Sequence, residues 1–387
     1  MNFKRVCIVA TAPFVLKWFM APHVKKLSEI YHVTLVANGH DDALVSLLGD
    51  NVSFISIEIE RKISLRSDII SFFKLWRLFQ KSDFISVHSI MPKSGLLAML
   101  AAKISGVPLR FHTFTGQVWA TKKGIARYFL KRMDMLISGC STVVLADSPS
   151  QKIFLVQNKI MPSENIRVLA NGSIAGVDLR RFSPDAAIRK MYREKFNIPD
   201  NAIIYLFVGR LTKDKGIIDL INAFAKICDL KPDLHLMVVG PDEGGISNAV
   251  QELERQFPGH VHQTGFTNTP EEYMMTADVF CLPSYREGFG SSIIEAAAIG
   301  LPAIASRIYG VIDAVKDNMT GILHEPGDID GISNAMYNLA TNYDLRIRLG
   351  MAAREWVKDH FSEQSVTQAF LDFYDQQISM VESKNIL

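Results

Sequence analysis

Two glutamates bracket a flexible, hydroxyl-rich loop in REGFGSSIIEAAAIG, residues 286–300. Glu287 stands before the glycines, and Glu295 lies eight residues later in an apolar run typical of a buried helix that begins at Ser291. The segment Gly288–Gly290 would then lie at the amino end of that helix, where backbone N–H groups can face a ligand. Carboxylates accept hydrogen bonds from vicinal hydroxyls. The spacing therefore predicts two acids that read different parts of one hydroxylated ligand.

An ordinary structural role is the alternative for each acid. A lone glutamate near the start of a helix is stabilised by the helix dipole, which accounts easily for Glu287. The same explanation suits Glu295 less well, because its neighbours Ile294 and Ala296 belong to an apolar run and a buried acid needs a partner.

A second informative loop, GRLTKDKG at 209–216, directly follows a strand-like run. Gly209 permits a sharp turn, and Arg210 and Lys215 would stand at the strand end, beside the amino end of the next helix. Fixed cations next to a positive helix end favour a diphosphate. Taken alone, the loop is equally compatible with incidental solvated charges. Together the two loops predict a site for a nucleotide-sugar, with its diphosphate, ribose and hexose.

The elements that must position these loops are strands that alternate with helical patterns, in two sets. The strand-like runs are 6–10, 33–38, 52–59, 84–89, 109–114 and 143–147, then 203–209, 234–240, 261–265, 278–284 and 302–306. This rhythm predicts an α/β fold of βαβ units in two Rossmann-like domains with parallel sheets. Ligands of such sheets bind beyond the carboxyl ends of the strands, where both loops fall.

The domain junction is expected within 172–185, a stretch rich in Gly, Ser and Pro. We predict one domain at 1–175 and a nucleotide-sugar-binding domain at 176–361. A last helical pattern, at about 362–387, can pack back on the first domain. A chain of 387 residues suits two domains of this size.

The net charge of +2 hides an asymmetry between the two halves. Residues 1–175 carry 22 Lys and Arg against 11 Asp and Glu, whereas the remainder carries 20 against 29. Two segments of the basic half, 61–81 with six cations and 122–138 with five, also contain Phe72, Phe73, Trp76, Phe79, Tyr128 and Phe129. This combination is typical of helices at an anionic membrane surface. Ordinary Rossmann helices with a solvated cationic face are the alternative.

Several function classes are disfavoured by composition. No run of 18 apolar residues predicts a spanning helix, and the N-terminus reads as a first strand and not as a signal peptide. The four cysteines are scattered, which argues against disulfides and structural zinc and fits a reducing compartment. Nucleic-acid binding is not expected, because the basic half lacks a recognition motif. We find no Asp-x-Asp or His/Asp cluster at ligand spacing, so we expect no metal and no cofactor besides the nucleotide-sugar.

The chain resembles the retaining glycosyltransferases of family 4, which have the two-domain GT-B fold. The motifs that carry the resemblance are GRLTKDKG (209–216), VVGPDEGG (238–245), PSYREGFGSSIIEAAAIGLPAIAS (283–306), TGILHEPGD (320–328) and NGSIAGVDLRRFSP (171–184). They cover the C-terminal half in order. The stretches HTFTGQVW and NGSIAGVDLRRF are similar to bacterial polysaccharide-assembly enzymes, including those of lipopolysaccharide.

The resemblance implies that the domain at 1–175 binds the acceptor, and it implies roles by position in the other domain. Arg210 and Lys215 match the pair that grips the donor diphosphate, Glu295 the acid that holds the ribose, and Glu287 the acid that contacts the transferred hexose. Other donor-binding positions would be Gly209, Gly288, Phe289, Gly290, Ser291 and Ser292. The donor would be a UDP-hexose or UDP-N-acetylhexosamine, with uracil near the loops after 240 and 265.

The resemblance is looser in the N-terminal half. His112, followed by Gly116, looks like the family's H-x-x-x-G loop, whose histidine approaches the donor sugar at the reaction centre. His88 at another strand end is a weaker candidate. Ala10-Thr11-Ala12-Pro13-Phe14 lacks the glycines that many members carry after the first strand. The apolar residues that follow, Phe14, Trp18, Phe19 and Met20, would either line a lipid acceptor groove or pack in the core.

The implied reaction is metal-independent retaining transfer to a saccharide acceptor, lipid-diphosphate-linked, at the cytoplasmic face of the inner membrane. The catalytic set would be His112, Glu287, Arg210 and Lys215, acting by positioning and by preorganised charge. Two alternatives stay open: a UDP-sugar epimerase or phosphorylase of the same architecture, and a non-catalytic sugar-binding protein. Incubation of the donor without acceptor would separate an epimerase from a transferase.

Overall fold

The computed structural model describes residues 3–60, 64–231 and 233–385. Residues 61–63 of the predicted basic segment, and residues 1–2 and 386–387 of the predicted domains, lie outside this description. The strands are β1 (Arg5–Val9), β2 (His32–Ala37), β3 (Val52–Ser56), β4 (Phe84–Ile90), β5 (Leu109–Phe114), β6 (Val143–Ala146), β7 (Ile166–Arg167), β8 (Ile203–Val208), β9 (Leu234–Val239), β10 (Val261–Thr264), β11 (Val279–Leu282), β12 (Ala303–Ser306) and β13 (Gly321–His324).

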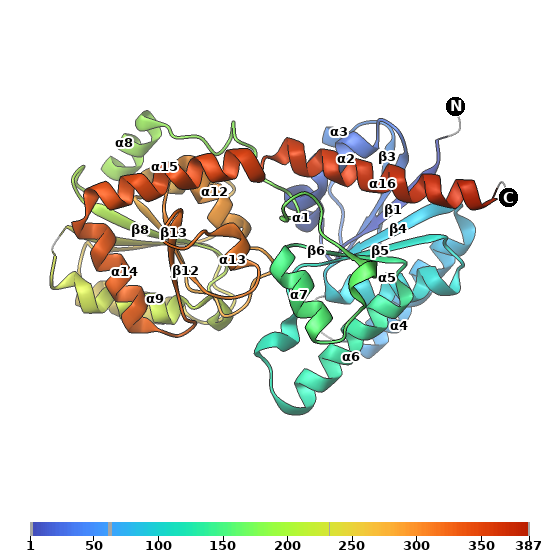
Figure 1. The fold of residues 1–387 in the computed structure, drawn as a ribbon, viewed down its shortest axis with the longest axis horizontal. Coiled ribbons are helices and arrows are strands. Elements are labelled where there is room, and N and C mark those ends of the chain that lie inside the picture. The colour runs from blue at the N-terminus through green and yellow to red at the C-terminus, as the bar shows by residue number, and fades with distance from the viewer. Residues whose placement is uncertain (1–2, 61–63, 232, 386–387) are drawn as a thin grey trace. The chain divides into compact units, whose positions relative to one another are not determined.

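Helices connect these strands (Figure 1). The α-helices are α1 (Pro13–Val15), α2 (Ala21–Leu27), α3 (Asp42–Leu48), α4 (Leu65–Lys81), α5 (Pro92–Ile104), α6 (Gly124–Cys140), α7 (Pro149–Gln157), α8 (Ala186–Lys195), α9 (Ile217–Cys228), α10 (Ser247–Gln256), α11 (Pro270–Thr276), α12 (Ser291–Ile299), α13 (Val311–Ala314), α14 (Ile329–Thr341), α15 (Tyr343–His360) and α16 (Glu363–Asn385). A π-helical turn, η1 (Leu16–Met20), joins α1 to α2, and 3-10 turns form η2 (Val118–Thr121), η3 (Ser163–Asn165) and η4 (Lys213–Lys215).

The chain divides into two compact units. The first comprises Met1–Gly176 together with Glu363–Leu387, and the second comprises Val177–Ser362. The division falls within the Gly- and Pro-containing stretch where the junction was expected.

The first unit is built on a parallel sheet with the strand order β3-β2-β1-β4-β5-β6-β7. Side chains alternate along β1: Val6 and Ile8 enter a core shared with α2, α3 and α16, while Cys7 and Val9 enter a core shared with α4–α7. Both faces of the sheet are therefore buried, which explains why its strands read as continuous apolar runs.

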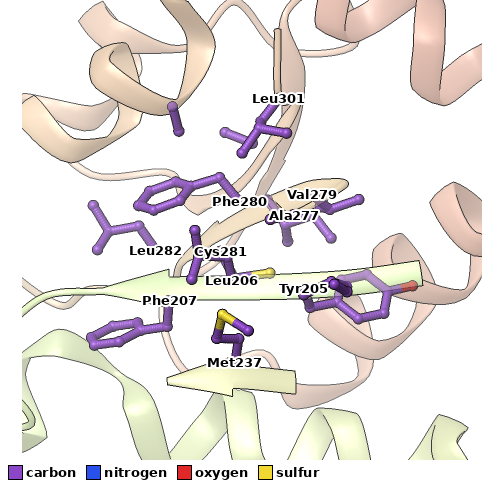
Figure 2. Packing of buried hydrophobic residues seen from close by; sticks show 14 of the residues in the cluster. Tyr205, Leu206, Phe207, Met237, Ala277, Val279, Phe280, Cys281, Leu282 and Leu301 are labelled. Atoms are coloured by element: carbon purple, nitrogen blue, oxygen red, sulfur yellow. The ribbon is translucent and has the colours of Figure 1, made fainter. Parts of the chain in front are cut away.

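The second unit has a parallel sheet in the order β10-β9-β8-β11-β12-β13. Figure 2 shows part of its core, with side chains of β8, β9 and β11 packed around Phe207, Met237 and Phe280. The buried Tyr205 hydroxyl donates a 2.6 Å hydrogen bond to the Met336 carbonyl oxygen, which ties β8 to α14. A buried polar group is thereby satisfied inside an otherwise apolar cluster.

The α/β fold with two parallel sheets is confirmed, and a strand occurs at every predicted run. Two strands were not predicted. β7 has two residues, too few to form an apolar run. β13, of sequence GILH, begins with glycine and ends with histidine, so it carries little apolar pattern of its own. Both are edge strands whose pairing depends on the neighbouring strand.

Strand order determines where a ligand can bind. In the second sheet the order reverses between β8 and β11, because β9 lies on one side of β8 and β11 on the other. Ligands of open α/β sheets bind at the carboxyl ends of the strands at such a switch point. The loops that follow β8 and β11 are 209–216 and 283–290, the two loops singled out by their residues.

Candidate active site

The loops after β8 and β11 touch through their backbones. Gly216 has a left-handed φ of +68°, and a Cβ atom there would lie 1.9 Å from the carbonyl oxygen of Pro283. Only glycine permits this approach. Close to this contact, the Tyr285 N–H donates a 2.9 Å hydrogen bond to the Asp214 carbonyl oxygen. The two loops therefore form one surface at the switch point.

Lys215 and Glu287 meet on this surface. Lys215 Nζ lies 2.6 Å from Glu287 Oε1, and the Ser284 hydroxyl donates to the same oxygen at 2.8 Å. The Glu287 side chain is 11% exposed and that of Lys215 is 19% exposed. The structure thus pairs the cation predicted for the diphosphate with the acid predicted for the hexose, which the spacing did not reveal.

Arg210 is held differently. Its Nη1 lies 2.9 Å from Glu243 Oε2, and both side chains are more than a third exposed. The sharp turn expected at Gly209 does not depend on a left-handed glycine there, because the φ angle of Gly209 is not in that region. The glycine that matters is Gly240, with φ +140°: a Cβ atom there would lie 1.9 Å from the Gly209 carbonyl oxygen. Arg210 can therefore exchange its partner at low cost, because exposed ion pairs contribute little.

The start of α12 follows the loop Gly288–Gly290, whose residues are buried. Gly290 occupies the N-cap position with φ +88°, and within the described chain no side chain caps the helix. Ser291 and Ser292 follow at the first two helical positions, half-buried. The buried Phe289 ring packs on Phe361 at 5.1 Å. An uncapped helix start exposes backbone N–H groups and a partial positive charge to an anion or to hydroxyl oxygens.

Glu295 lies one turn into α12 and is half-buried. Burial raises its pKa to about 7, with a smaller lowering from Arg181 and a further rise from Glu271. The Arg181 guanidinium itself donates to Glu271 Oε2 at 2.7 Å and to the Asn268 carbonyl oxygen at 2.9 Å. As expected from the spacing, Glu295 and Glu287 have separate surroundings. Glu295 is suited to accept hydrogen bonds from hydroxyls once it is ionised.

His112 belongs to the first unit, on β5, and its side chain is fully buried. Its Nδ1 lies 2.8 Å from the Ser89 hydroxyl, while Nε2 has no partner among the described residues. Burial, together with the nearby His88, lowers the pKa of His112 to about 3, so the ring is neutral. The helical residue Gly95 faces the ring, and a Cβ atom there would lie 2.4 Å from His112 Cε1.

His88, the weaker candidate, is a structural residue. Its Nδ1 lies 3.0 Å from the Tyr374 hydroxyl and its Nε2 2.8 Å from the Thr113 hydroxyl. The ring stacks on Phe370 of α16. Both nitrogens are therefore satisfied inside the core, and no atom is left for a substrate.

The suggested lipid groove after β1 is only partly supported by burial. Phe14 is 49% exposed, and Trp18 and Phe19 are half-buried, but Met20 is completely buried and packs in the core. The π-helical turn over Leu16–Met20 changes the helical register, so spacing alone could not predict which side chains face inward.

Four polar residues around the site were not singled out from the sequence: Asp214, Glu243, Ser284 and Arg286. All four lie inside motif segments, and Asp214 and Arg286 directly precede Lys215 and Glu287. The opposite charges of Asp214 and Arg286, at matching positions in the two loops, were the available signal for an ion pair. Pairing across 72 residues, however, depends on the parallel neighbours β8 and β11.

Comparisons with known proteins give the family of the chain. Residues 188–356 match the family model for glycosyl transferases group 1, and residues 27–172 match that for a glycosyl transferase 4-like domain. The capsular polysaccharide biosynthesis glycosyltransferase CapM of Staphylococcus aureus is 32% identical over 332 residues, 85% of this chain and 86% of that protein. This chain is a family 4 glycosyltransferase.

A second relative of this family 4 glycosyltransferase comes from Escherichia coli. It is named UDP-Gal:alpha-D-GlcNAc-diphosphoundecaprenol alpha-1,3-galactosyltransferase and is 27% identical over 364 residues, 92% of this chain and 91% of that protein. A third, from Campylobacter jejuni, is named N,N'-diacetylbacillosaminyl-diphospho-undecaprenol alpha-1,3-N-acetylgalactosaminyltransferase. It is 24% identical and covers 97% of this chain and all of that protein.

Solved structures confirm the GT-B fold of this family 4 glycosyltransferase. HepE of Anabaena, solved with UDP, has a TM-score of 0.77 at 17% identity, covering 96% of this chain and 100% of that chain. Sucrose-phosphate synthase of Thermosynechococcus elongatus has a TM-score of 0.81 at 20% identity, covering 97% and 100%. Within the described residues, the helices of this enzyme are too short or too polar to span a bilayer.

Proposed function

We propose that this glycosyltransferase transfers a hexose or N-acetylhexosamine from a UDP-sugar, with retention of configuration, to a lipid-diphosphate-linked saccharide during assembly of a surface polysaccharide. The observation that carries the donor assignment is the meeting of Lys215 and Glu287 at the sheet switch point, beside the uncapped start of α12. The Lys215 ammonium, the Glu287 carboxylate, which can accept hydrogen bonds from sugar hydroxyls, and the positive end of α12 lie together where α/β sheets bind nucleotides.

The two cations would serve the diphosphate differently. Arg210 is paired with Glu243 at the surface, so an incoming diphosphate can replace Glu243 with little loss. Lys215 is less exposed and held by Glu287, so it offers a positive charge that is already in place. Preorganised charge of this kind stabilises a leaving diphosphate without reorganisation during the reaction. We infer that these side chains do the work that a metal ion does elsewhere, and that transfer is metal-independent.

The sugar would be positioned by acids and by a neutral imidazole. Glu287 keeps one carboxylate oxygen, Oε2, outside its contacts with Lys215 and Ser284. Glu295 would read the ribose hydroxyls. The buried Nε2 of His112 has no partner among the described residues, and this unsatisfied nitrogen supports a role toward the transferred sugar. None of these groups needs to become a nucleophile for the proposed transfer.

Two observations support the proposed lipid-linked acceptor: the names of two relatives and an exposed surface of the first unit. Two relatives are named for diphospho-undecaprenol-linked substrates. The first unit also exposes what we call the basic-aromatic surface, on helices α4 and α6, which both pack against α5. Its exposed apolar members are Leu65, Ile69, Ile70, Phe73, Trp76, Ile125, Tyr128, Phe129 and Leu136.

Exposed cations lie among these apolar side chains, and at one end Glu58 and Glu60 line a pocket together with Arg66 and Ile70. The exposed cations are Arg66, Lys74, Arg77, Lys81, Lys122, Lys123 and Arg132. The described acids of the two helices add little negative charge to this surface, because Asp68 pairs with Lys93 and Asp134 is buried. Phe79, one of the predicted aromatic members, is core. We propose that this surface lies on the anionic cytoplasmic face of the inner membrane, close to the lipid-linked acceptor.

A panel of UDP-sugars tests the reaction. Wild-type enzyme with an undecaprenyl-diphosphate-linked saccharide should release UDP from one UDP-hexose or UDP-N-acetylhexosamine, in the presence of EDTA, and the product should keep the anomeric configuration of the donor. Loss of activity in EDTA would contradict metal independence. Conversion of the donor without any acceptor would identify an epimerase instead, and binding without turnover would identify a sugar-binding protein.

Vesicle sedimentation tests the membrane assignment. The enzyme should sediment with vesicles that contain anionic phosphatidylglycerol, more weakly at high salt, and the variant Phe73→Ser/Trp76→Ser should remain in the supernatant. The variant Tyr337→Ser/Met351→Ser, which changes exposed apolar residues of the second unit, is the matched control. Equal sedimentation of both variants would rule out the basic-aromatic surface.

A further inference from the structure

We propose that Asp214 and Arg286 form a clasp that keeps Lys215 paired with Glu287, an inference that rests on the proposed function of that pair. The clasp residues are positioning residues: they act through their neighbours in the two loops and need not touch the substrate.

The clasp is a well-formed ion pair between the two loops. Arg286 Nη2 lies 2.7 Å from Asp214 Oδ2, with side chains 19% and 28% exposed. The other oxygen, Oδ1, accepts a 2.6 Å hydrogen bond from the Thr212 hydroxyl. Burial raises the pKa of Asp214, but the Thr212 hydrogen bond and the charge of Arg286 outweigh this, so the pKa is lowered and the carboxylate is ionised.

The order of charges in the two loops creates a choice of partners. One loop carries Asp214 and then Lys215; the other carries Arg286 and then Glu287. The two ion pairs between the loops, Asp214 with Arg286 and Lys215 with Glu287, satisfy all four charges. If one residue of a pair is removed, its former partner can pair instead with the oppositely charged neighbour in its own loop. Without Asp214, Arg286 is free to pair with Glu287 and to compete there with Lys215. Without Arg286, Asp214 is free to draw Lys215 away from Glu287.

The clasp is not required to join the loops. Their backbones already meet at Gly216 and Pro283, and the Tyr285 N–H donates to the Asp214 carbonyl oxygen whatever the side chain at 214. A partly exposed ion pair also adds little to stability. Its effect should therefore fall on which side chains are paired, and hence on the position of the Lys215 ammonium, whose four-carbon stem is flexible.

This competition predicts an unusual pattern for single and double variants. Asp214→Asn and Arg286→Gln should each lower kcat with the active UDP-sugar by on the order of 10-fold, because a small misplacement of a positioning group is costly. The double variant D214N/R286Q removes both competing charges, so Lys215 and Glu287 pair again and most of the activity returns. A purely structural tie would make the double variant at least as poor as either single variant.

The rate at which acetic anhydride acetylates Lys215, measured by mass spectrometry, reports whether Lys215 is paired with Glu287, and no nucleotide is needed. Asp214→Asn should raise the acetylation rate several-fold, and D214N/R286Q should return it toward the wild-type rate. Asp330→Asn, which breaks the exposed Lys226–Asp330 pair of the same unit, is the control and should leave Lys215 labelling and kcat unchanged.

The two readouts separate the clasp from the proposed function. Recovery of the wild-type labelling rate in the double variant supports the clasp even if no UDP-sugar is turned over, in which case the proposed function alone fails. Unchanged labelling in Asp214→Asn, or a double variant that labels as fast as Asp214→Asn, overturns the clasp. Turnover of a UDP-sugar by all variants at the wild-type rate also overturns it.

Discussion

Lys215 Nζ donates to Glu287 Oε1 at 2.6 Å, although the two residues are 72 positions apart in the chain. The same oxygen accepts from the Ser284 hydroxyl. The acid is thus held on one side by its own loop and on the other by the neighbouring loop. An ammonium group and a carboxylate are thereby fixed relative to each other, and under the proposed function this preorganisation would reduce the cost of binding and reaction.

Replacing Glu287 by Gln should lower kcat by about 100-fold, because the amide cannot hold the Lys215 ammonium or accept hydroxyl hydrogen bonds as strongly as a carboxylate. The free energy of unfolding should fall by no more than about 2 kcal/mol. UDP release and thermal unfolding measure the two effects. Glu325→Gln, which removes a 69% exposed acid beside Arg307, is the matched control and should keep full activity. Near-normal turnover of Glu287→Gln would refute this site.

Arg210 and Glu243 should have opposite effects on donor binding. Arg210→Ala should weaken UDP binding about 10-fold or more, because a charge-assisted hydrogen bond to the diphosphate is lost. Glu243→Gln should tighten it, since the diphosphate then meets no competing carboxylate. Isothermal titration calorimetry with UDP measures both. Arg180→Ala, at a 92% exposed side chain, should change nothing. Equal affinities for wild type and Arg210→Ala would exclude Arg210 from the donor site.

The pH dependence of donor binding should follow Glu295. Burial raises its pKa to about 7 from the usual 4.5, so the folded protein retains a proton that the unfolded chain has lost between these values. The contribution of Glu295 to stability should therefore fall as pH rises from about 4.5 to about 7, and Glu295→Gln should remove that contribution. Asp134 and Asp147, whose pKa values burial also raises, add contributions of the same sign.

The ionised carboxylate accepts ribose hydrogen bonds better than the acid does, so affinity for a UDP-hexose should rise between about pH 6 and pH 8. A UDP-hexose is the suitable probe, because its diphosphate has no proton to lose in this range. Calorimetry at several pH values measures the slope. An equal slope in Glu295→Gln would show that another group is responsible.

Gly95→Ala should disturb His112. The added methyl group would lie 2.4 Å from His112 Cε1, so the ring or the start of α5 must move, at a cost of about 1–3 kcal/mol in stability. Turnover should fall, with the larger change in kcat if His112 positions the transferred sugar. Gly139→Ala is the control, because it also lies in a helix of the first unit but has open space around it, and it should stabilise the protein slightly.

The double variant His112→Ala/Gly95→Ala separates packing from function. Removing the ring makes room for the methyl group, so the double variant should be more stable than Gly95→Ala alone while it remains as inactive as His112→Ala. Full activity of His112→Ala would show that His112 is a core residue and nothing more. Thermal unfolding and initial rates give both answers.

Much of the fold could be predicted because local pattern is sufficient for it. Apolar runs of four to eight residues flanked by polar loops predicted strands such as β8 and β11, and the loops after them carried the candidate site. The missed strands, β7 and β13, lack such a run and are defined by pairing with β6 and β12. Phe79, predicted for a membrane surface, is a core residue, and Met20, for which a groove and the core were both open, packs in the core. Helical register and neighbouring helices determine which side is covered.

The sequence by itself determined which residues are candidates for the donor site, since Arg210, Lys215, Glu287 and Glu295 occupy motif loops whose place after a strand follows from local pattern. Only the tertiary structure decided how they are paired: Lys215 with Glu287, Arg210 with Glu243, and Asp214 with Arg286. It also decided that the His112 ring is buried and neutral. The reason is physical. A side chain's type is a property of the chain, whereas its partners and its exposure to water depend on which strands become neighbours in the sheet.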